Sequence, residues 1–368
     1  MMNCQKRKFF IVTTMIIAIC FVSFFVGCSK NIGNDSIKAS IGNAEQINDL
    51  LKLKHRLRVN ENGEFTILFF SDVQFSTPNI AAKTLDDIET IVSRETPDLV
   101  VFNGDNSTGI KDIESMRIYI SNMTRCLEKN KIPWAHVYGN HDAEGDNLPK
   151  EIQQEIYESF DYCVSKAGDE NLFGVGNFVI PVLDYSCDKI EFNVWCLDSG
   201  SSRIPYNKYK SEHKEVDGNV FYAHYEPMQQ NQVDWFKNTT SILEKYNGGH
   251  IPGIMAFHIP LQETYYAWNN KEKLGLEWSG EKRENISAHA QDVSLFAAAK
   301  ESDILAIINS HDHLNDFMVR YEGIRLCYTA SIGINEYYAD DMLGGRIVKF
   351  SAQNPTDIKT YMSYVNRR

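Results

Sequence analysis

The sequence predicts an α/β fold in which a sheet is covered by helices on both faces. Short apolar segments typical of buried strands alternate with amphipathic segments typical of helices, which is the pattern of βαβ units. A composition of 43% hydrophobic and 23% charged residues over 368 positions is that of an ordinary globular protein. Such a chain can bury one large core or two modest ones. Polar residues directly follow several predicted strands, at the sheet edge where α/β folds bind ligands.

The first 28 residues differ in composition from the rest of the chain. Lys6, Arg7 and Lys8 precede 19 uncharged residues that end before Cys28, which is typical of a secretory signal. Residues 25–28, FVGC, resemble a bacterial lipobox, so Cys28 is the predicted lipidation site and mature N-terminus. An uncleaved membrane anchor and a simple cleaved signal are the alternatives. In each case the basic residues before the apolar segment predict that the folded part of the chain lies outside the cytoplasm. A lipid on Cys28 or an uncleaved apolar segment would attach it to the membrane.

The net charge and the cysteine spacing argue against a nucleic-acid-binding protein and against a disulfide-stabilised fold. The formal net charge is −12, and loss of the signal would remove three cations and no acids, giving −15. Such acidity argues against nucleic acid as the main partner. An odd number of cysteines without tight spacing remains after the signal, which predicts free thiols rather than a disulfide framework. These are Cys126, Cys163, Cys187, Cys196 and Cys327. The oligomeric state stays open.

Three predicted strands in the first half of the chain end in polar residues. After a polar tether over 29–54, residues 57–70 indicate two short strands across an Asn-Glu-Asn-Gly turn, the second ending at Ser71-Asp72. An amphipathic helix and an apolar strand then lead to Gly104-Asp105. A helix over 115–128 and another strand lead to residues 139–142, GNHD. We expect parallel strands whose carboxyl ends lie together.

The second half is less regular. Segments near 177–184 and 190–197 indicate a hairpin, and a helix over 230–245 precedes a strand that delivers His258. Residues 261–287 are polar and aromatic without a clear period, so we expect a long loop or lid there with a functional role. A helix over 288–300 leads to the apolar strand 304–308, and further β-structure closes the chain.

The predicted strand ends together offer the ligands of a metal site. His311 and His313 are two residues apart just beyond a strand, so their side chains should point to the same side. Mixed carboxylate, amide and imidazole ligands suit two divalent ions such as Mn, Zn or Fe. Asp105 could bridge ions about 3.5–4 Å apart, with a bridging hydroxide as the nucleophile. The candidate ligands are Asp72, Asp105, Asn140, His258, His311 and His313.

Five sequence segments resemble a known family. In order, SDVQ, NGDN, YGNHD, AFHIP and SHDHLND resemble the five blocks of the calcineurin-like metallophosphoesterase superfamily. WCLDSG, QVDWF, HIPLQE and GGRIVKF are further similar to the branch of fungal cell-cycle phosphatases and short plant purple acid phosphatase-like proteins. The resemblance covers about residues 55–365. It implies a four-layer α-β-β-α sandwich with two mixed sheets over a domain of residues 55–368.

The resemblance also implies roles for single residues. One ion would bind Asp72, Asp105 and His313, while the second would bind Asp105, Asn140, His258 and His311. His141 would face the leaving group as a general acid or as a charge clamp on the phosphoryl oxygens.

Two positions depart from the family pattern. Gln74 occupies the place of a histidine in the first block; its carbonyl oxygen can ligate as a neutral donor, so we expect a tuned rather than a lost site. Thr108 stands where purple members carry a tyrosine, so no tyrosinate–iron colour is expected.

The sequence therefore predicts a metal-dependent phosphoesterase that hydrolyses monoesters. A phosphodiesterase acting on nucleotides or lipid head groups is one alternative. A non-catalytic surface-binding lipoprotein with a weakened metal site is the alternative from another class. Asp142, Asn106 and Asp316 are expected to support the site or to touch the substrate. The histidines expected at the surface are His55, His136, His213, His224 and His250.

Overall fold

The structure is a computed structural model that describes residues 46–203, 213–216 and 219–366. The predicted signal, Cys28 and most of the predicted tether lie outside the described residues. Within the described part, every helix is too short or too polar to cross a bilayer.

One sheet has five strands in the order β15-β14-β2-β3-β4. Strands β2 (Glu64–Phe70), β3 (Leu99–Asn103) and β4 (Trp134–Val137) are parallel, as predicted from the βαβ pattern. The connecting helices are α3 (Ala82–Glu95), α4 (Ile113–Met123) and α5 (Arg125–Asn130), and α6 (Lys150–Glu158) follows β4. Strands β14 (Gly344–Ser351) and β15 (Lys359–Tyr364) add antiparallel pairs.

The other sheet has eight strands in the order β1-β5-β6-β9-β11-β13-β12-β10. The predicted hairpin is present, because β5 (Phe178–Leu183) and β6 (Ile190–Cys196) pair antiparallel. Strands β6, β9 (Gly253–Ala256), β11 (Ile304–Asn309) and β13 (Ile324–Tyr328) are mutually parallel. The remaining strands are β1 (Leu57–Arg58), β10 (Trp278–Ser279) and β12 (Met318–Tyr321). A separate hairpin joins β7 (His213–Val216) and β8 (Asn219–Tyr222).

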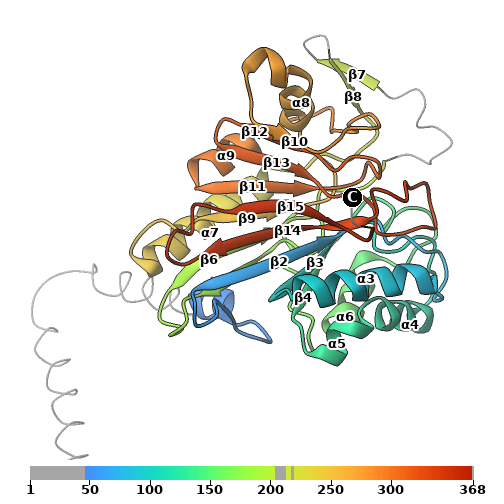
Figure 1. Ribbon diagram of the computed structural model, residues 1–368, viewed down its shortest axis with the longest axis horizontal. Helices are drawn as coiled ribbons and strands as arrows, with labels where there is room; N and C mark the ends of the chain where they lie inside the picture. Colours follow the sequence, from blue (N-terminus) through green and yellow to red (C-terminus); the bar gives the residue numbers. More distant parts are fainter. Residues whose placement is uncertain (1–45, 204–212, 217–218, 367–368) are drawn as a thin grey trace, which may run out of the picture. The chain divides into compact units, whose positions relative to one another are not determined.

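The period-2 alternation of the strands builds three buried layers of side chains. In β2, Phe65 and Ile67 point into the core between the sheets, while Leu68 and Phe70 point to the core under α3–α6. A third core lies between the eight-stranded sheet and α7 (Gln230–Asn247), α8 (Gln262–Leu274) and α9 (Leu295–Glu301). Figure 1 shows α3–α6 gathered beside β2–β4. The four-layer α-β-β-α arrangement with two mixed sheets is therefore confirmed.

Two local predictions in the second half are wrong. Residues 261–287 are not a loop throughout, because α8 occupies 262–274. Only Thr264, Ala267 and Trp268 of this helix are buried, and so narrow a stripe leaves no clear period in the sequence. The helix predicted from residue 288 begins at Leu295. The backbone on both sides of His289 instead pairs with Tyr222: Tyr222 N donates to Ala288 O, and Ala290 N donates to Tyr222 O. These carbonyl and N–H groups are therefore not available for helical hydrogen bonds.

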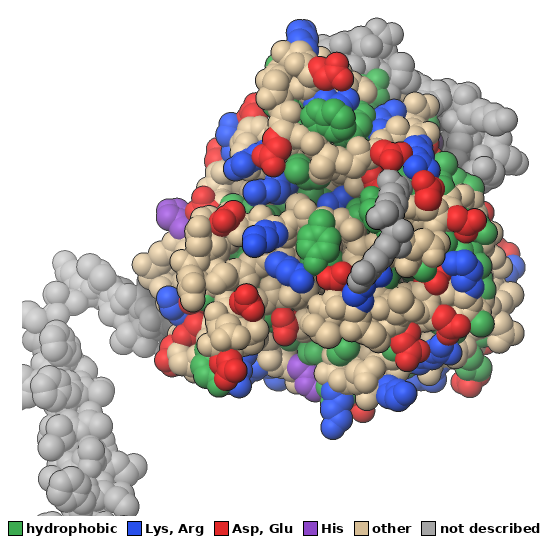
Figure 2. Space-filling view, in the orientation of Figure 1, with side chains coloured by type: hydrophobic (Ala, Val, Ile, Leu, Met, Phe, Trp, Pro, Cys, Tyr) green, Lys and Arg blue, Asp and Glu red, His purple; other side chains and the backbone are tan. Residues whose placement is uncertain are grey.

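The described cysteines are free, as predicted, and four of the five are buried. Figure 2 shows that basic and acidic side chains are interspersed over the face seen there, with apolar side chains between them. The core therefore rests on packing of the three apolar layers rather than on disulfides.

Candidate metal centre

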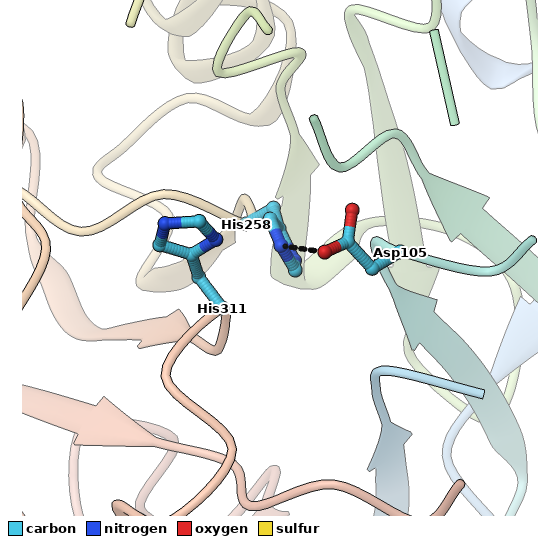
Figure 3. Close-up of side chains that lie close together, drawn as sticks. All are labelled: Asp105, His258 and His311. Carbon is cyan, nitrogen blue, oxygen red and sulfur yellow. Dashed lines mark ion pairs between the residues drawn. The ribbon is translucent and has the colours of Figure 1, made fainter. Parts of the chain in front are cut away.

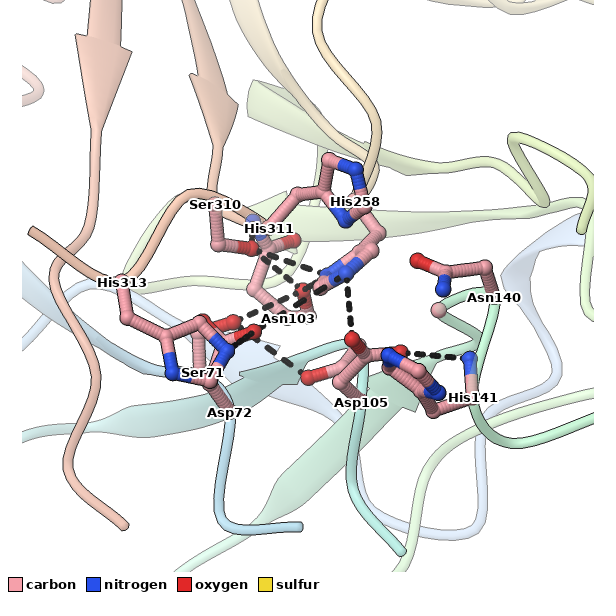
Figure 4. A network of polar contacts seen from close by, with 12 residues as sticks. Ser71, Asp72, Asn103, Asp105, Asn140, His141, His258, Ser310, His311 and His313 are labelled. Carbon is pink, nitrogen blue, oxygen red and sulfur yellow. Dashed lines mark hydrogen bonds and ion pairs between the residues drawn. The ribbon is translucent and has the colours of Figure 1, made fainter. Parts of the chain in front are cut away.

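The carboxyl ends of strands from both sheets meet at one place. From the five-stranded sheet, Asp72 follows β2, Asp105 follows β3, and Asn140 comes three residues after β4. From the eight-stranded sheet, His258 follows β9 and the two histidines of SHDH follow β11. Figure 4 shows these side chains facing one another. The oxygen ligands thus come from one sheet and the imidazoles from the other.

The convergence is close enough to hold two metal ions. Ligand atoms of Asp105, His258 and His311 lie within 4.8 Å of one another, and so do those of Asp72, Asp105 and His313. Figure 3 shows the first of these sets, with His258 directed at Asp105. Asp105 belongs to both sets, as expected of a bridging carboxylate.

Several buried ligand atoms have no hydrogen-bond partner. Such an atom costs about 1–3 kcal/mol unless something satisfies it, and a cation would satisfy all of them at once. His258 Nε2 lies 3.0 Å from Asp105 Oδ2 without hydrogen-bond geometry, as two ligands of one ion would. The atoms are both carboxylate oxygens of Asp72, Gln74 Oε1, Asp105 Oδ2, Asn140 Oδ1, His258 Nε2 and His311 Nδ1. Carboxylate, amide and imidazole atoms of this kind suit divalent ions, so these residues, Gln74 among them, are candidate ligands.

Four of the candidate ligands adopt a left-handed backbone conformation, which is uncommon for residues other than glycine. The φ angles are 55° at Asp72, 50° at Gln74, 48° at Asp105 and 83° at His311. Each such residue costs of order 1–3 kcal/mol and persists only where the surroundings enforce it. At Asp72, Gln74 and Asp105 the turns after β2 and β3 enforce it by bonding to each other, from Asp72 N to Gly104 O and from Gln74 N to Asp105 O, both 3.1 Å.

Gly104 makes room for His258. Its φ is +91°, and a Cβ at this position would lie 2.5 Å from His258 Nδ1. Any larger residue would push the imidazole away from Asp105, so the glycine of the NGDN segment serves the site directly.

A backbone or hydroxyl group orients each imidazole. His258 Nδ1 lies 3.0 Å from the carbonyl oxygen of Asn103, and His313 Nδ1 lies 2.8 Å from that of Tyr337, whose ring also stacks on it. His311 Nε2 lies 2.8 Å from the Tyr225 hydroxyl. These contacts leave His258 Nε2, His313 Nε2 and His311 Nδ1 for the ligand cluster. Neither tyrosine could be predicted from the sequence, since no motif marks it.

Opposite charges dominate the electrostatics of the cluster. Burial opposes ionisation of Asp105, but the charges of His258 and His141 outweigh it and hold its pKa well below the usual range. Burial raises the pKa of Asp72, and the nearby histidines offset this only in part. Burial would lower the pKa of His258, yet Asp105 raises it to about 9. Asp105 and His258 thus stabilise each other's charged form within the buried cluster.

His141 lies at the edge of the cluster. Its backbone N–H donates to Asp105 Oδ1 at 2.8 Å, and its Nδ1 lies 2.9 Å from Glu144 Oε2. Burial opposes its protonation, but Asp105 and Glu144 raise its pKa to about 9. The side chain is 29% exposed and faces a cavity of about 690 Å³. That cavity is lined by His141, Tyr225, Glu284, His311, His313 and Tyr337, among others.

Asp142, Asn106 and Asp316, which were predicted to support the site or touch the substrate, lie at different distances from the ligand cluster. Asp142 accepts from the backbone of Gly139, Asn106 and Ser107, and so ties the loop after β4 to the turn after β3. The Asn106 side chain donates to Val137 O within the same junction. The Asp316 carboxylate accepts from Glu281 N and the Tyr364 hydroxyl, so it fastens segments beyond the ligand cluster.

Two histidines expected at the surface are buried instead. His136 is 1% exposed and stacks on Tyr157, and His224 is 1% exposed. Burial lowers the pKa of His136 to about 3, so it stays neutral in the core. His250, by contrast, has a 78% exposed side chain, as predicted.

Comparison with known proteins identifies the family. The sequence profile of the calcineurin-like phosphoesterases matches residues 65–315. An Arabidopsis thaliana protein named probable inactive purple acid phosphatase 29 is 27% identical, over 77% of this chain and 76% of its own. Phosphatase DCR2 of Saccharomyces cerevisiae is 26% identical over 74% of this chain, which spans about half, 49%, of the yeast protein.

Among solved structures, a dimetal phosphatase from Danio rerio is similar over 81% of this chain and 98% of its own, with 13% identity and a TM-score of 0.49. The family implies a centre of two divalent metal ions, for which the residues at the strand ends are candidate ligands. This chain belongs to the calcineurin-like metallophosphoesterase family.

Proposed function

We propose that this chain hydrolyses phosphate monoesters with the help of two divalent metal ions. The observation that carries the proposal is the pair of ligand sets that share Asp105. One ion would bind Asp72, Gln74, Asp105 and His313, and the other Asp105, Asn140, His258 and His311. When bound, such ions supply positive charge to the phosphoryl oxygens and an activated water.

The chain's own groups would position the ester and move one proton. His141 engages Nδ1 with Glu144, so its Nε2 is the nitrogen available to a leaving-group oxygen in the cavity. The raised pKa of His141 keeps a proton on this imidazole near neutral pH, as a general acid requires. Asp105 holds the His141 backbone at the same time, which keeps the proton donor beside the phosphoryl group.

The name of the Arabidopsis relative includes the word inactive, which raises the alternative of a binding protein with a weakened site. Gln74 is the residue on which this alternative rests. Its Oε1 is buried without a hydrogen-bond partner, and its backbone N–H is fixed by Asp105 and Asn106 carbonyls. A neutral amide oxygen can still ligate a metal ion, so Gln74 supports metal binding at reduced affinity and we favour the hydrolase.

Hydrolysis assays separate these functions. The purified full-length chain, stripped of metal and refilled with Mn²⁺ or Zn²⁺, should cleave p-nitrophenyl phosphate. Cleavage of bis(p-nitrophenyl) phosphate alone would favour the phosphodiesterase. Failure with both esters, together with less than one metal ion per chain, would favour the binding protein. His141→Ala should lower turnover and leave the metal content unchanged; loss of metal would instead make His141 a ligand.

We also propose that the domain lies outside the cytoplasm and is attached to the membrane through Cys28. The composition of residues 1–28 supports this proposal. Fractionation and labelling with a fatty-acid analogue should find label on the wild-type chain and none on Cys28→Ala. Equal labelling of both chains would contradict lipidation at this residue.

A further inference from the structure

One carboxylate holds both neighbouring residues of the GNHD segment. Glu144 Oε1 accepts from Asn140 Nδ2 at 3.1 Å, and Glu144 Oε2 lies 2.9 Å from His141 Nδ1. Asn140 and His141 follow β4 and lie side by side at the edge of the ligand cluster (Figure 4). The two oxygens of Glu144 are therefore divided between a candidate metal ligand and the candidate proton donor.

The loop around Glu144 is built to present this carboxylate. Asn147 Nδ2 donates to the carbonyl oxygens of His141 and Glu144, at 2.5 and 3.0 Å, and Ala143 N donates to Asn140 O at 3.2 Å. These bonds close a compact turn over 140–147. The Glu144 side chain is 16% exposed, so it is enclosed by the loop rather than extended into solvent.

The contact with Asn140 decides which end of its amide faces the metal. The amide carries one donor end and one acceptor end, and only the oxygen can bind a cation. With Nδ2 held by Glu144, Oδ1 is the end left buried without a hydrogen-bond partner. A flipped amide would aim two N–H donors at a cation, so the Glu144 contact selects the productive orientation.

The contact with His141 decides which ring nitrogen serves the substrate. Nδ1 is engaged by Glu144, which fixes the ring plane and leaves Nε2 for the cavity. A carboxylate at this position also stabilises a proton on the imidazole until it is transferred. We infer that Glu144 is a positioning residue that orients both Asn140 toward a metal ion and His141 toward the leaving group, an inference that rests on the proposed function.

An ordinary ion pair three residues apart would not have this effect. Exposed pairs contribute little, and the same loop contains one: Asp146 is 79% exposed and pairs with Lys111 at 2.7 Å. Glu144 differs because it is enclosed and because both of its oxygens contact functional candidates. Asp146 therefore provides a matched control within the same loop.

Two substitutions test the two contacts. In Glu144→Ala both contacts are lost, so the affinity for one of the two ions should fall about 10–100-fold, as for other residues that orient metal ligands. Turnover of alkyl phosphates should fall more than that of p-nitrophenyl phosphate, because a poor leaving group depends more on the proton from His141. Glu144→Gln keeps an acceptor oxygen for Asn140 Nδ2 but loses the negative charge beside His141 Nδ1, so the Mn²⁺ affinity should stay near that of the wild type while the change in leaving-group dependence remains.

The measurements are Mn²⁺ titration by calorimetry, metal content after dialysis, and the ratio of alkyl to aryl phosphate turnover. Asp146→Ala should match the wild type in all three, and thermal melting of each variant checks that it folds. The inference is overturned if Glu144→Ala and Glu144→Gln both keep wild-type Mn²⁺ affinity and the wild-type ratio. If the wild type cleaves no ester, the proposed function fails, while the Mn²⁺ titration still tests the contact with Asn140.

Discussion

Asp105→Asn should release both metal ions at once. Asp105 is the residue common to the two ligand sets, and its Oδ1 accepts from His141 N at 2.8 Å. Asparagine keeps the size of the side chain and an oxygen for that bond. Because that oxygen stays with His141 N, the amide nitrogen replaces Oδ2, so the variant removes both the negative charge and the oxygen that faces the ligand cluster.

The expected loss can be worked from this geometry. Two unit charges about 4 Å apart interact with about 4 kcal/mol at an effective dielectric constant near 20, and a divalent ion interacts about twice as strongly, so about 4 kcal/mol is a lower limit. A factor of ten in affinity corresponds to about 1.4 kcal/mol, so each ion should bind at least about a thousandfold more weakly. The lost charge is also the main cause of the raised His258 pKa, which should fall in the metal-free variant.

Calorimetric Mn²⁺ titration of wild type and Asp105→Asn measures the effect. Asp146→Asn is the control, because it removes an exposed carboxylate from a neighbouring loop without touching the cluster. Loss of only one ion would show that Asp105 serves a single metal. Retention of both ions at wild-type affinity would refute both the bridging role and the expected thousandfold loss.

Three further predictions concern the same centre. Tyr225→Phe removes the hydroxyl that lies 2.8 Å from His311 Nε2, so the affinity for one ion should fall about 10–100-fold while the melting temperature stays unchanged. If the variant binds Mn²⁺ as tightly as the wild type, the Tyr225 contact does not orient His311. Gln74→His should raise the affinity at one site, and an unchanged Mn²⁺ titration would show that Gln74 is not a ligand. Metal affinity should rise with pH up to about 9, by as much as tenfold per unit, because His258 holds a proton up to that pH and must release it to bind an ion. A titration that is flat between pH 6 and 9 would contradict this.

The sequence was most informative where short-range patterns decide the structure. In α3 the helical spacing of Leu85, Ile88, Ile91 and Val92 places all four on the buried face. The alternation in β2 likewise distributes its side chains between two cores. Parallel strands then bring their carboxyl ends together, so that Asp72 and Asp105, far apart in the sequence, could be predicted as neighbours.

The remainder depends on contacts that no local pattern encodes. Tyr225 and Tyr337 reach the imidazoles from segments 86 and 24 residues away in the chain. The narrow buried stripe of α8 leaves no clear period, which is why 261–287 was predicted as a loop. The contact between Glu144 and His141 could have been predicted, since a carboxylate three residues beyond a histidine can contact it. The spacing alone does not show the second contact, with Asn140.

We expect two divalent ions to bind side by side and to share the Asp105 carboxylate. The most direct test of this shared site is Mn²⁺ loading of the wild-type chain followed by electron paramagnetic resonance and elemental analysis. Ions about 3.5–4 Å apart should give two Mn²⁺ per chain with an exchange-coupled spectrum. A single ion per chain, or two ions with the uncoupled six-line spectra of isolated Mn²⁺, would show that Asp105 does not join two ions in one centre.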